Sequence, residues 1–292
     1  AFYSANGMTL CVIGKEPLAE LEAIVREHFA AVVDKGLSLP LGDAVSDKPP
    51  FLPGDWNRLL LQCPVKDVKQ LTFSWVLPYQ APFWRSKPTA YISHLLGHEG
   101  KGSLTSVMKE RGIISGCSAG GGGWLEGAFS LLHVRFDLTD KGLFEVEQIG
   151  TLLFAYLAML QKVEVKRWIL EELQRLRQVQ FRFDNDKRPF DLAAQIASSL
   201  QKHPASEALA GGTLLYEPDV EATGSVLQLL RLDNVRVTHE AKALSERCTE
   251  RDTSYDSPMK FEPLLPEWLA SWSKALAGGP SAEEATAAAA AL

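Results

Sequence analysis

The sequence predicts an α+β fold, because its expected strands and its expected helices come in runs and do not alternate regularly along the chain. Short stretches in which apolar side chains alternate or cluster are expected to be strands, and they are 58–62, 70–77, 127–138 and 234–239. Other stretches carry apolar side chains at helical spacing, and they are 139–162, 166–183, 190–200, 204–209 and 218–230. A chain of 292 residues is long enough to bury a full core between such layers.

The chain is organised around residues 88–122, which are expected to form two short helices followed by a glycine-rich strand. The first helix runs from Thr89 to about Gly97, with its apolar side chains at helical spacing. A glycine-rich break follows, and Ser103 is placed to cap the second helix. That helix ends at Gly112, since glycine is a common residue just past a helix C-terminus.

Two histidines four residues apart on the first helix invite comparison with zinc peptidases. These enzymes use His-Glu-x-x-His or the inverted His-x-x-Glu-His on one helix. Here the pair is His94 and His98, but Gly97 stands where the inverted motif needs its glutamate. The nearest glutamate is Glu99, which follows the second histidine. In a helix it would lie about 100° further round the axis than residue 98. The pattern is therefore close to a zinc motif without matching it.

Two alternatives remain open for these side chains. The histidines can simply cap and pack the C-terminal end of their helix, where the helix dipole favours a cation. Alternatively, His94, His98 and Glu99 could form the site of a hydrolase directly.

Composition excludes several classes of function. The net charge of −6, with no basic cluster, argues against a nucleic-acid partner. The four cysteines are far apart and form no CxxC pair, which argues against a zinc knuckle or a disulfide scaffold and favours a reducing, cytoplasmic location. No run of about 18 apolar residues occurs, so we expect no transmembrane helix and no membrane partner.

The beginning of the chain is expected to be a separate unit. Residues 8–13 are predicted as a strand and 16–31 as a helix, which together make a lone βα unit over residues 1–33. Residues 34–54 are rich in Pro, Gly and Asp and are expected to be an extended linker.

A larger domain is predicted over residues 55–243, and residues 244–292 are expected to be an irregular C-terminal segment. Within that segment the apolar stretch PLLPEWLASW (263–272) is placed to pack back on the domain. The end of the chain, 275–292, is of low complexity and is expected to be disordered.

The stretch HLLGHEGKGSL (94–104) resembles the second domain of the insulin-degrading enzyme and pitrilysin family of zinc metallopeptidases. The resemblance extends over most of residues 1–240, in the order and spacing of that family. It is carried by further motifs, which are YSANGMTLCVIGKEPLAELEAIV, VRFDLTDKGL, QFRFDNDKRPFDLAAQIA and LRLDNVRVTHEAK.

This resemblance implies an antiparallel or mixed sheet with helices packed on one face. It also implies that residues 1–33 are the last βα unit of a preceding catalytic domain and that 55–243 is the non-catalytic second domain. The parent protein would be a zinc-dependent metalloendopeptidase, with the zinc outside this chain. The expected partners are peptide substrates, the catalytic domain and the C-terminal half of the parent.

In the resembling family the second domain lines a degradation chamber and holds the N-terminal end of the substrate at an exosite. The residues at the corresponding positions here are His94, Gly97, Glu99, Cys117, Ser118, Ala119, Gly120 and Gly121. A glycine-rich edge strand can bind an extended peptide through its backbone, and Glu99 offers a carboxylate to the peptide's α-ammonium group. This chain departs from the family, which commonly has larger aliphatic residues at positions 117 and 118 and Gln at 121.

Two alternatives to this interpretation also stay open. The glycine run can be a flexible hairpin loop that binds nothing. The whole chain can be a scaffolding or binding subunit that has the same fold but takes no part in hydrolysis.

The division into units predicts where a protease will cut. Limited proteolysis should cleave first between Leu37 and Pro53, or after Ala275, because these stretches have the composition of a linker and of a tail. Mass spectrometry of the early fragments checks this. Early cleavage inside 85–138, with the linker intact, would contradict the division.

Overall fold

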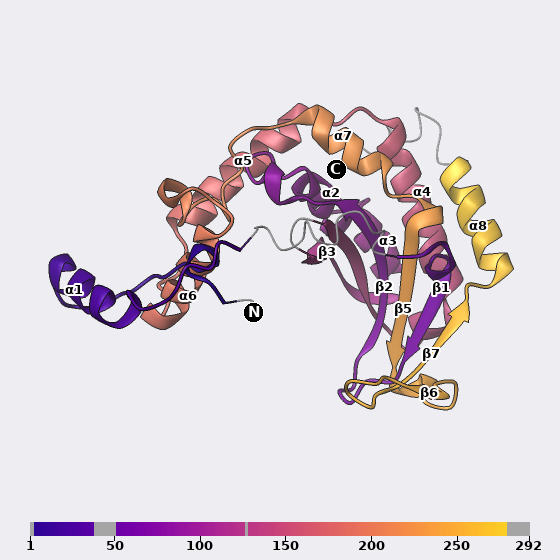
Figure 1. Cartoon of the computed structure of the whole chain (residues 1–292). Coiled ribbons are helices and arrows are strands. Elements are labelled where there is room, and N and C mark those ends of the chain that lie inside the picture. The colour runs from indigo at the N-terminus through magenta and orange to yellow at the C-terminus, as the bar shows by residue number, and fades with distance from the viewer. Residues whose placement is uncertain (1–2, 38–50, 126–127, 279–292) are drawn as a thin grey trace.

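The computed structural model describes residues 3–37, 51–125 and 128–278, and its centre is one seven-stranded sheet (Figure 1). The strand order is β3-β4-β2-β5-β1-β7-β6. β1 and β5 are parallel, and every other neighbouring pair is antiparallel, so the sheet is mixed. The strands are β1 (Arg58–Gln62), β2 (Lys69–Pro78), β3 (Ile114–Leu125), β4 (Phe129–Leu138), β5 (Val235–Ala241), β6 (Glu250–Arg251) and β7 (Pro258–Pro263).

The helices cover one face of this sheet, and two of them extend to the side. Figure 1 shows α5 leading away from the sheet towards α6 and α1. None of the described helices is both long and apolar enough to cross a membrane. Their bounds are α1 (Leu18–Phe29), α2 (Pro88–Gly97), α3 (Leu104–Glu110), α4 (Val146–Lys162), α5 (Arg167–Arg182), α6 (Pro189–Leu200), α7 (Val220–Gln228) and α8 (Pro266–Ala277).

The two faces of the sheet differ in polarity, because side chains alternate along each strand. On β4, Leu132, Val134, Phe136 and Leu138 are buried in the core shared with the helices. The residues between them carry polar groups on the other face, where His133 lies 2.7 Å from the Ser74 hydroxyl and Gln70 donates to Asp137 at 2.8 Å. The predicted α+β class with a one-sided helical layer is therefore confirmed.

Helix α8 is attached to the sheet domain by a close contact with α4. Trp272 is fully buried, and its indole N–H donates to the Glu147 carbonyl at 2.9 Å. Its ring lies over Gly150, so near that a Cβ atom at this position would come within 2.2 Å of the ring. The absence of a side chain at residue 150 thus makes room for the tryptophan.

The C-terminal segment is more regular than expected. Residues 258–263 were predicted to be irregular, but they form β7, because they pair with β1 in an antiparallel register that places Phe261 opposite Leu60. The predicted packing of PLLPEWLASW is confirmed by α8. Residues 275–277 were expected to be disordered, but they complete α8. The rest of the low-complexity end from 279 onwards, and residues 38–50 of the linker predicted over 34–54, lie outside the described residues.

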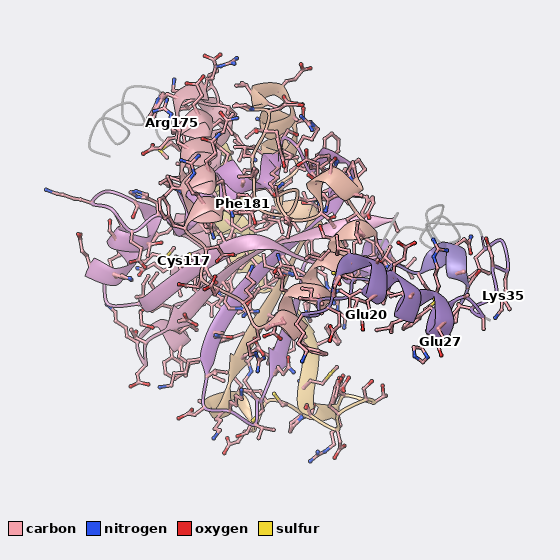
Figure 2. All side chains as sticks on the ribbon, turned by 90° about the vertical axis from the view of Figure 1, so that its left-hand side faces the viewer. Glu20, Glu27, Lys35, Cys117, Arg175 and Phe181 are labelled. Carbon is pink, nitrogen blue, oxygen red and sulfur yellow. The ribbon has the colours of Figure 1, made fainter. Side chains whose placement is uncertain are left out.

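The strand predicted over residues 8–13 does not form. These residues have no regular secondary structure, because no described strand lies beside them to complete a ladder. The following helix is confirmed as α1, but none of its residues is buried. Figure 2 shows α1, with Glu20 and Glu27, projecting from the side of the molecule. The segment contacts α6, where Thr9 donates to the Ala197 carbonyl at 2.6 Å.

The contact of Trp272 with Gly150 predicts opposite effects for two similar substitutions. Gly150→Ala should destabilise the fold by about 1–3 kcal/mol, because the new methyl group overpacks the core and displaces Trp272. Gly224→Ala on α7 is the matched control, since its Cβ would meet only the Val165 side chain at 3.9 Å. That change should stabilise the helix by about 0.5–1 kcal/mol. Urea unfolding of both variants measures the difference, and a stabilised Gly150→Ala variant would contradict this packing.

Candidate functional site

The candidate peptide-binding segment Cys117–Gly121 lies on β3, the first strand in the order of the sheet. One side of β3 pairs with β4, and no strand of the described residues pairs with its other side. The register is regular from Gly116 to Gly122 and shifts at both ends of this stretch, as expected for β-bulges. The N–H and C=O groups on the outer side of this stretch are therefore placed to accept an added strand.

The glycine run is part of this strand. The alternative interpretation as a hairpin loop is wrong for residues 120–125, because they are within β3 and pair with β4 over the stretch from His133 to Phe129. Ser118 is exposed, whereas Cys117 and Ala119 are half-buried and pack against the core. Cys117, Ala119 and Gly121 thus face the helical layer, and the residues between them face the opposite side of the sheet.

The C-terminal end of α2 lies against the middle of β3. A Cβ atom at Gly97 would be 4.0 Å from the Ala119 nitrogen, and the Cys117 thiol donates to the Leu96 carbonyl at 3.5 Å. Burial raises the pKa of this thiol to about 11, so the thiolate required of a nucleophile is scarce at neutral pH. Figure 2 shows Cys117 on β3. The contacts indicate that α2 supports the strand from the helical side.

Glu99 follows α2 and is held by an ion pair that sequence analysis missed. Lys109 of α3 donates to its carboxylate at 2.8 Å, and both side chains are partly exposed. Nothing in the spacing of the sequence signals this pair, because the two residues belong to different elements. The carboxylate expected to bind an α-ammonium group is therefore already paired, though exposed pairs of this kind contribute little free energy.

His94 lies close to His98, with ring centres 5.7 Å apart. Burial, and then the neighbouring His98, hold the pKa of His94 below its ordinary value, although Glu172 of α5 acts in the opposite direction. His94 is thus neutral at pH 7 and offers a polar group rather than a charge. His98 ends α2, and its Nδ1 accepts a hydrogen bond from the Gly100 N–H at 3.1 Å.

These groups do not form a metal site. Within 3–37, 51–125 and 128–278, no three His, Cys, Asp or Glu side chains come together in a way that could hold a metal ion. Glu99 is paired with Lys109, and no third ligand joins the two histidines. The residues present therefore do not fit the zinc that the family resemblance implies for the parent protein.

A cavity beside the strand was not foreseen from the sequence. It has a volume of about 230 Å³ and lies where Gly121 meets the start of α2. Its lining residues come from distant parts of the chain, which is why no local pattern indicates it. They are Tyr79, Gln80, Ala81, Trp84, Thr89, Gly121, Ser130, Leu131, Lys202 and His203.

Comparison with known families gives two adjacent matches. Residues 1–177 match the family described as the M16 peptidase inactive domain. Residues 181–285 match the family described as the middle or third domain of M16 peptidases. The two matches together cover nearly the whole chain, and their junction falls within α5.

Similar proteins are much longer than this chain. Insulin-degrading enzyme from Homo sapiens is 32% identical over 277 residues, which are 94% of this chain and 26% of that protein. A-factor-processing enzyme from Saccharomyces cerevisiae is 35% identical over 253 residues, covering 86% of this chain and 24% of that protein. The chain thus spans about a quarter of the length of these relatives.

The fold resembles the crystal structure of pitrilysin, with a TM-score of 0.80. The match covers 91% of this chain and 28% of that one, at 21% sequence identity. At this level of identity the likeness concerns the fold.

The geometry of the two histidines predicts that the purified chain holds no stoichiometric zinc, because two imidazoles without a third ligand bind the ion weakly. Elemental analysis after dialysis against zinc measures this, with the His94→Ala variant as a control for adventitious binding. One tightly held zinc per chain that disappears in His94→Ala would overturn the prediction.

Proposed function

This chain is a member of the M16 peptidase family, and on that premise we propose that it is the non-catalytic part of a zinc-dependent endopeptidase. In this proposal the chain forms part of the wall of a substrate chamber and holds the N-terminal end of a peptide along β3. Zinc and hydrolysis belong to a part of the parent protein outside this chain. The observation that carries the proposal is the outer edge of β3, which is in regular register from Gly116 to Gly122.

An edge strand binds peptides with little regard to their sequence, because the contacts are backbone hydrogen bonds. Each bond contributes about 0.5–1.5 kcal/mol net. A peptide that makes a few of them should therefore bind this chain with a Kd of about 0.1–1 mM, equivalent to about 4–5.5 kcal/mol. Weak, sequence-tolerant binding suits a protein that must retain many different peptides and release them.

The polar face of the sheet supports the same proposal. His133 and Gln70 lie on the face away from the helices, where each makes a hydrogen bond to a neighbouring strand. Such pairs keep the face hydrated and satisfy its polar groups without a covering layer. A chamber wall that contacts unfolded peptides needs a surface of this kind.

Recognition of the peptide's N-terminus is assigned to Glu99, with His94 as a neutral neighbour. A peptide amine has to compete with Lys109 for the carboxylate. Because that ion pair is exposed, its loss costs only a small free energy. The Glu99 carboxylate is paired with Lys109 in the free chain and with the peptide amine in the complex, so it is paired in both.

The competition with Lys109 predicts a gain in affinity when this lysine is removed. Lys109→Met should tighten binding of a peptide with a free amine by about 1.5- to 5-fold, the range expected from an exposed ion pair. Glu99→Gln should weaken the same binding, and N-terminal acetylation of the peptide should abolish both effects. Amide shifts in NMR titrations give the affinities and show whether β3 is the site.

Lys69→Met is the matched control for this experiment. Lys69 forms a comparable ion pair with Asp140 and has a side-chain exposure of 37%, against 36% for Lys109. The Lys69→Met substitution should leave the affinity for the peptide unchanged. Shifts confined to other parts of the chain, or affinity indifferent to acetylation, would overturn the proposed function.

A further inference from the structure

The face of β3 that points away from the helices carries almost no side chains. From 116 to 120 the residues on this face are Gly116, Ser118 and Gly120, since those between them face the helical layer. An extended peptide paired with the outer edge of β3 directs every second side chain to the same face. Such a side chain meets nothing larger than a serine on β3, and the next side chains in its way belong to β4.

Side chains of β4 extend over this bare strip. In the register of the sheet, Asp137 lies beside Gly116 and Arg135 lies beside Ser118. The reach is seen directly at Gly116, where a Cβ atom would be 3.0 Å from Oδ2 of Asp137. Because neighbouring strands are about 4.8 Å apart, a peptide outside β3 would lie about 9.5 Å from β4. The long side chains of arginine and glutamate can close a gap of this size when they extend towards each other.

Arg135 is exposed and has no partner for its charge. Its side chain makes no hydrogen bond and no ion pair within the part of the chain that the structure describes. The residues beside it are uncharged, with Ser118 on β3 and Thr72 on β2. Asp137 is on the same face of β4, but Gln70 donates a hydrogen bond to it at 2.8 Å. The guanidinium is therefore available to a carboxylate from another molecule.

We propose that Arg135 selects peptides that carry a glutamate, an inference that rests on the proposed function of β3. The glutamate lies beside Ser118, on the face away from the helices, and its carboxylate accepts hydrogen bonds from the guanidinium across the strand. A guanidinium and a carboxylate match in two parallel hydrogen bonds, which fixes their orientation as well as their charges. The favoured substrates are therefore peptides with a glutamate at one defined position.

The charges along β4 make this selection depend on position. A glutamate beside Gly116 would lie next to Asp137, and like charges on neighbouring strands repel. A shift of the glutamate by a single residue would turn it to the helical face, away from Arg135. One position is thus favoured, the next gains nothing from Arg135, and the one after it, towards Gly116, is disfavoured.

The test moves one glutamate along successive positions of an otherwise uncharged peptide with a free amine. Each peptide is compared with the same peptide carrying glutamine, which has the same shape without the charge. In NMR titrations of the whole chain, glutamate at the favoured position should bind about 1.5- to 5-fold more tightly than glutamine, the range expected from an exposed ion pair. The advantage should shrink in 1 M salt, where charges are screened over about 3 Å.

Variants of Arg135 assign the effect to this side chain. Arg135→Gln should abolish the advantage of glutamate over glutamine, and amide shifts on β3 with the glutamine peptide report that the strand is intact. Arg135→Glu should reverse the preference, so that a lysine at the favoured position binds more tightly than glutamine.

Arg175→Gln is the matched control for Arg135→Gln. Arg175 is also exposed and makes no ion pair within the described residues, but it belongs to α5, where Figure 2 labels it apart from Cys117 on β3. The substitution removes the same charge from the chain and should preserve the full advantage of glutamate.

The outcomes separate this inference from the proposed function. Equal affinities for glutamate and glutamine at every position, with shifts on β3, would overturn the role of Arg135 and leave the proposed function standing. An advantage that survives Arg135→Gln, disappears in Arg175→Gln or is the same at every position would also overturn it. Absence of shifts on β3 with every peptide would overturn both.

Discussion

The architecture depends on the position of β5 in the middle of the sheet. β5 is parallel to β1 on one side and antiparallel to β2 on the other, so these two strands, which are neighbours in the sequence, are joined through it. β2 then pairs with β4 and β4 with β3, which leaves β3 at the margin. The outer backbone groups of β3 therefore have no partner strand within the described residues.

The helical layer stabilises this arrangement at two points of close approach. Trp272 fits over Gly150 and attaches α8 to α4, while the end of α2 lies against β3 near Gly97 and Ala119. The first contact requires a position without a side chain, because a Cβ atom at residue 150 would overlap the tryptophan ring. Together they make the helical side of the sheet rigid and tightly packed, and they leave the polar side and the margin for contact with other molecules.

The sequence predicts the elements of this structure better than it predicts their pairing. The long helices α4 and α5 and the strands β2 and β4 carry strong periodic patterns and form close to where these patterns place them, although α4 begins at Val146 and not at 139. β7 was missed because prolines bound a short stretch that also contains charges, and its pairing with β1 outweighs this weak local pattern. Residues 8–13 are the opposite case. Their apolar pattern predicts a strand, but no described strand lies beside them, so they stay irregular.

For the candidate site too, the sequence indicates the residues but not the contacts between them. The family resemblance placed the segment Cys117–Gly121 and Glu99, but its position at the margin follows from strand order, which no local pattern contains. The ion pair of Glu99 with Lys109 and the position of Arg135 beside Ser118 arise from contacts between separate elements. Such contacts become visible only when the chain is folded.

The shifts of register at the two ends of 116–122 also limit what can bind. An exposed strand edge is a hazard, because another copy of the chain can continue the ladder and start an aggregate. A bulge turns the strand away and interrupts the spacing of its hydrogen-bonding groups. A long strand from a second molecule therefore finds matching groups over a few residues and then loses them. In the proposed function a short flexible segment can use all of them, so the irregularities would favour short segments whatever their sequence.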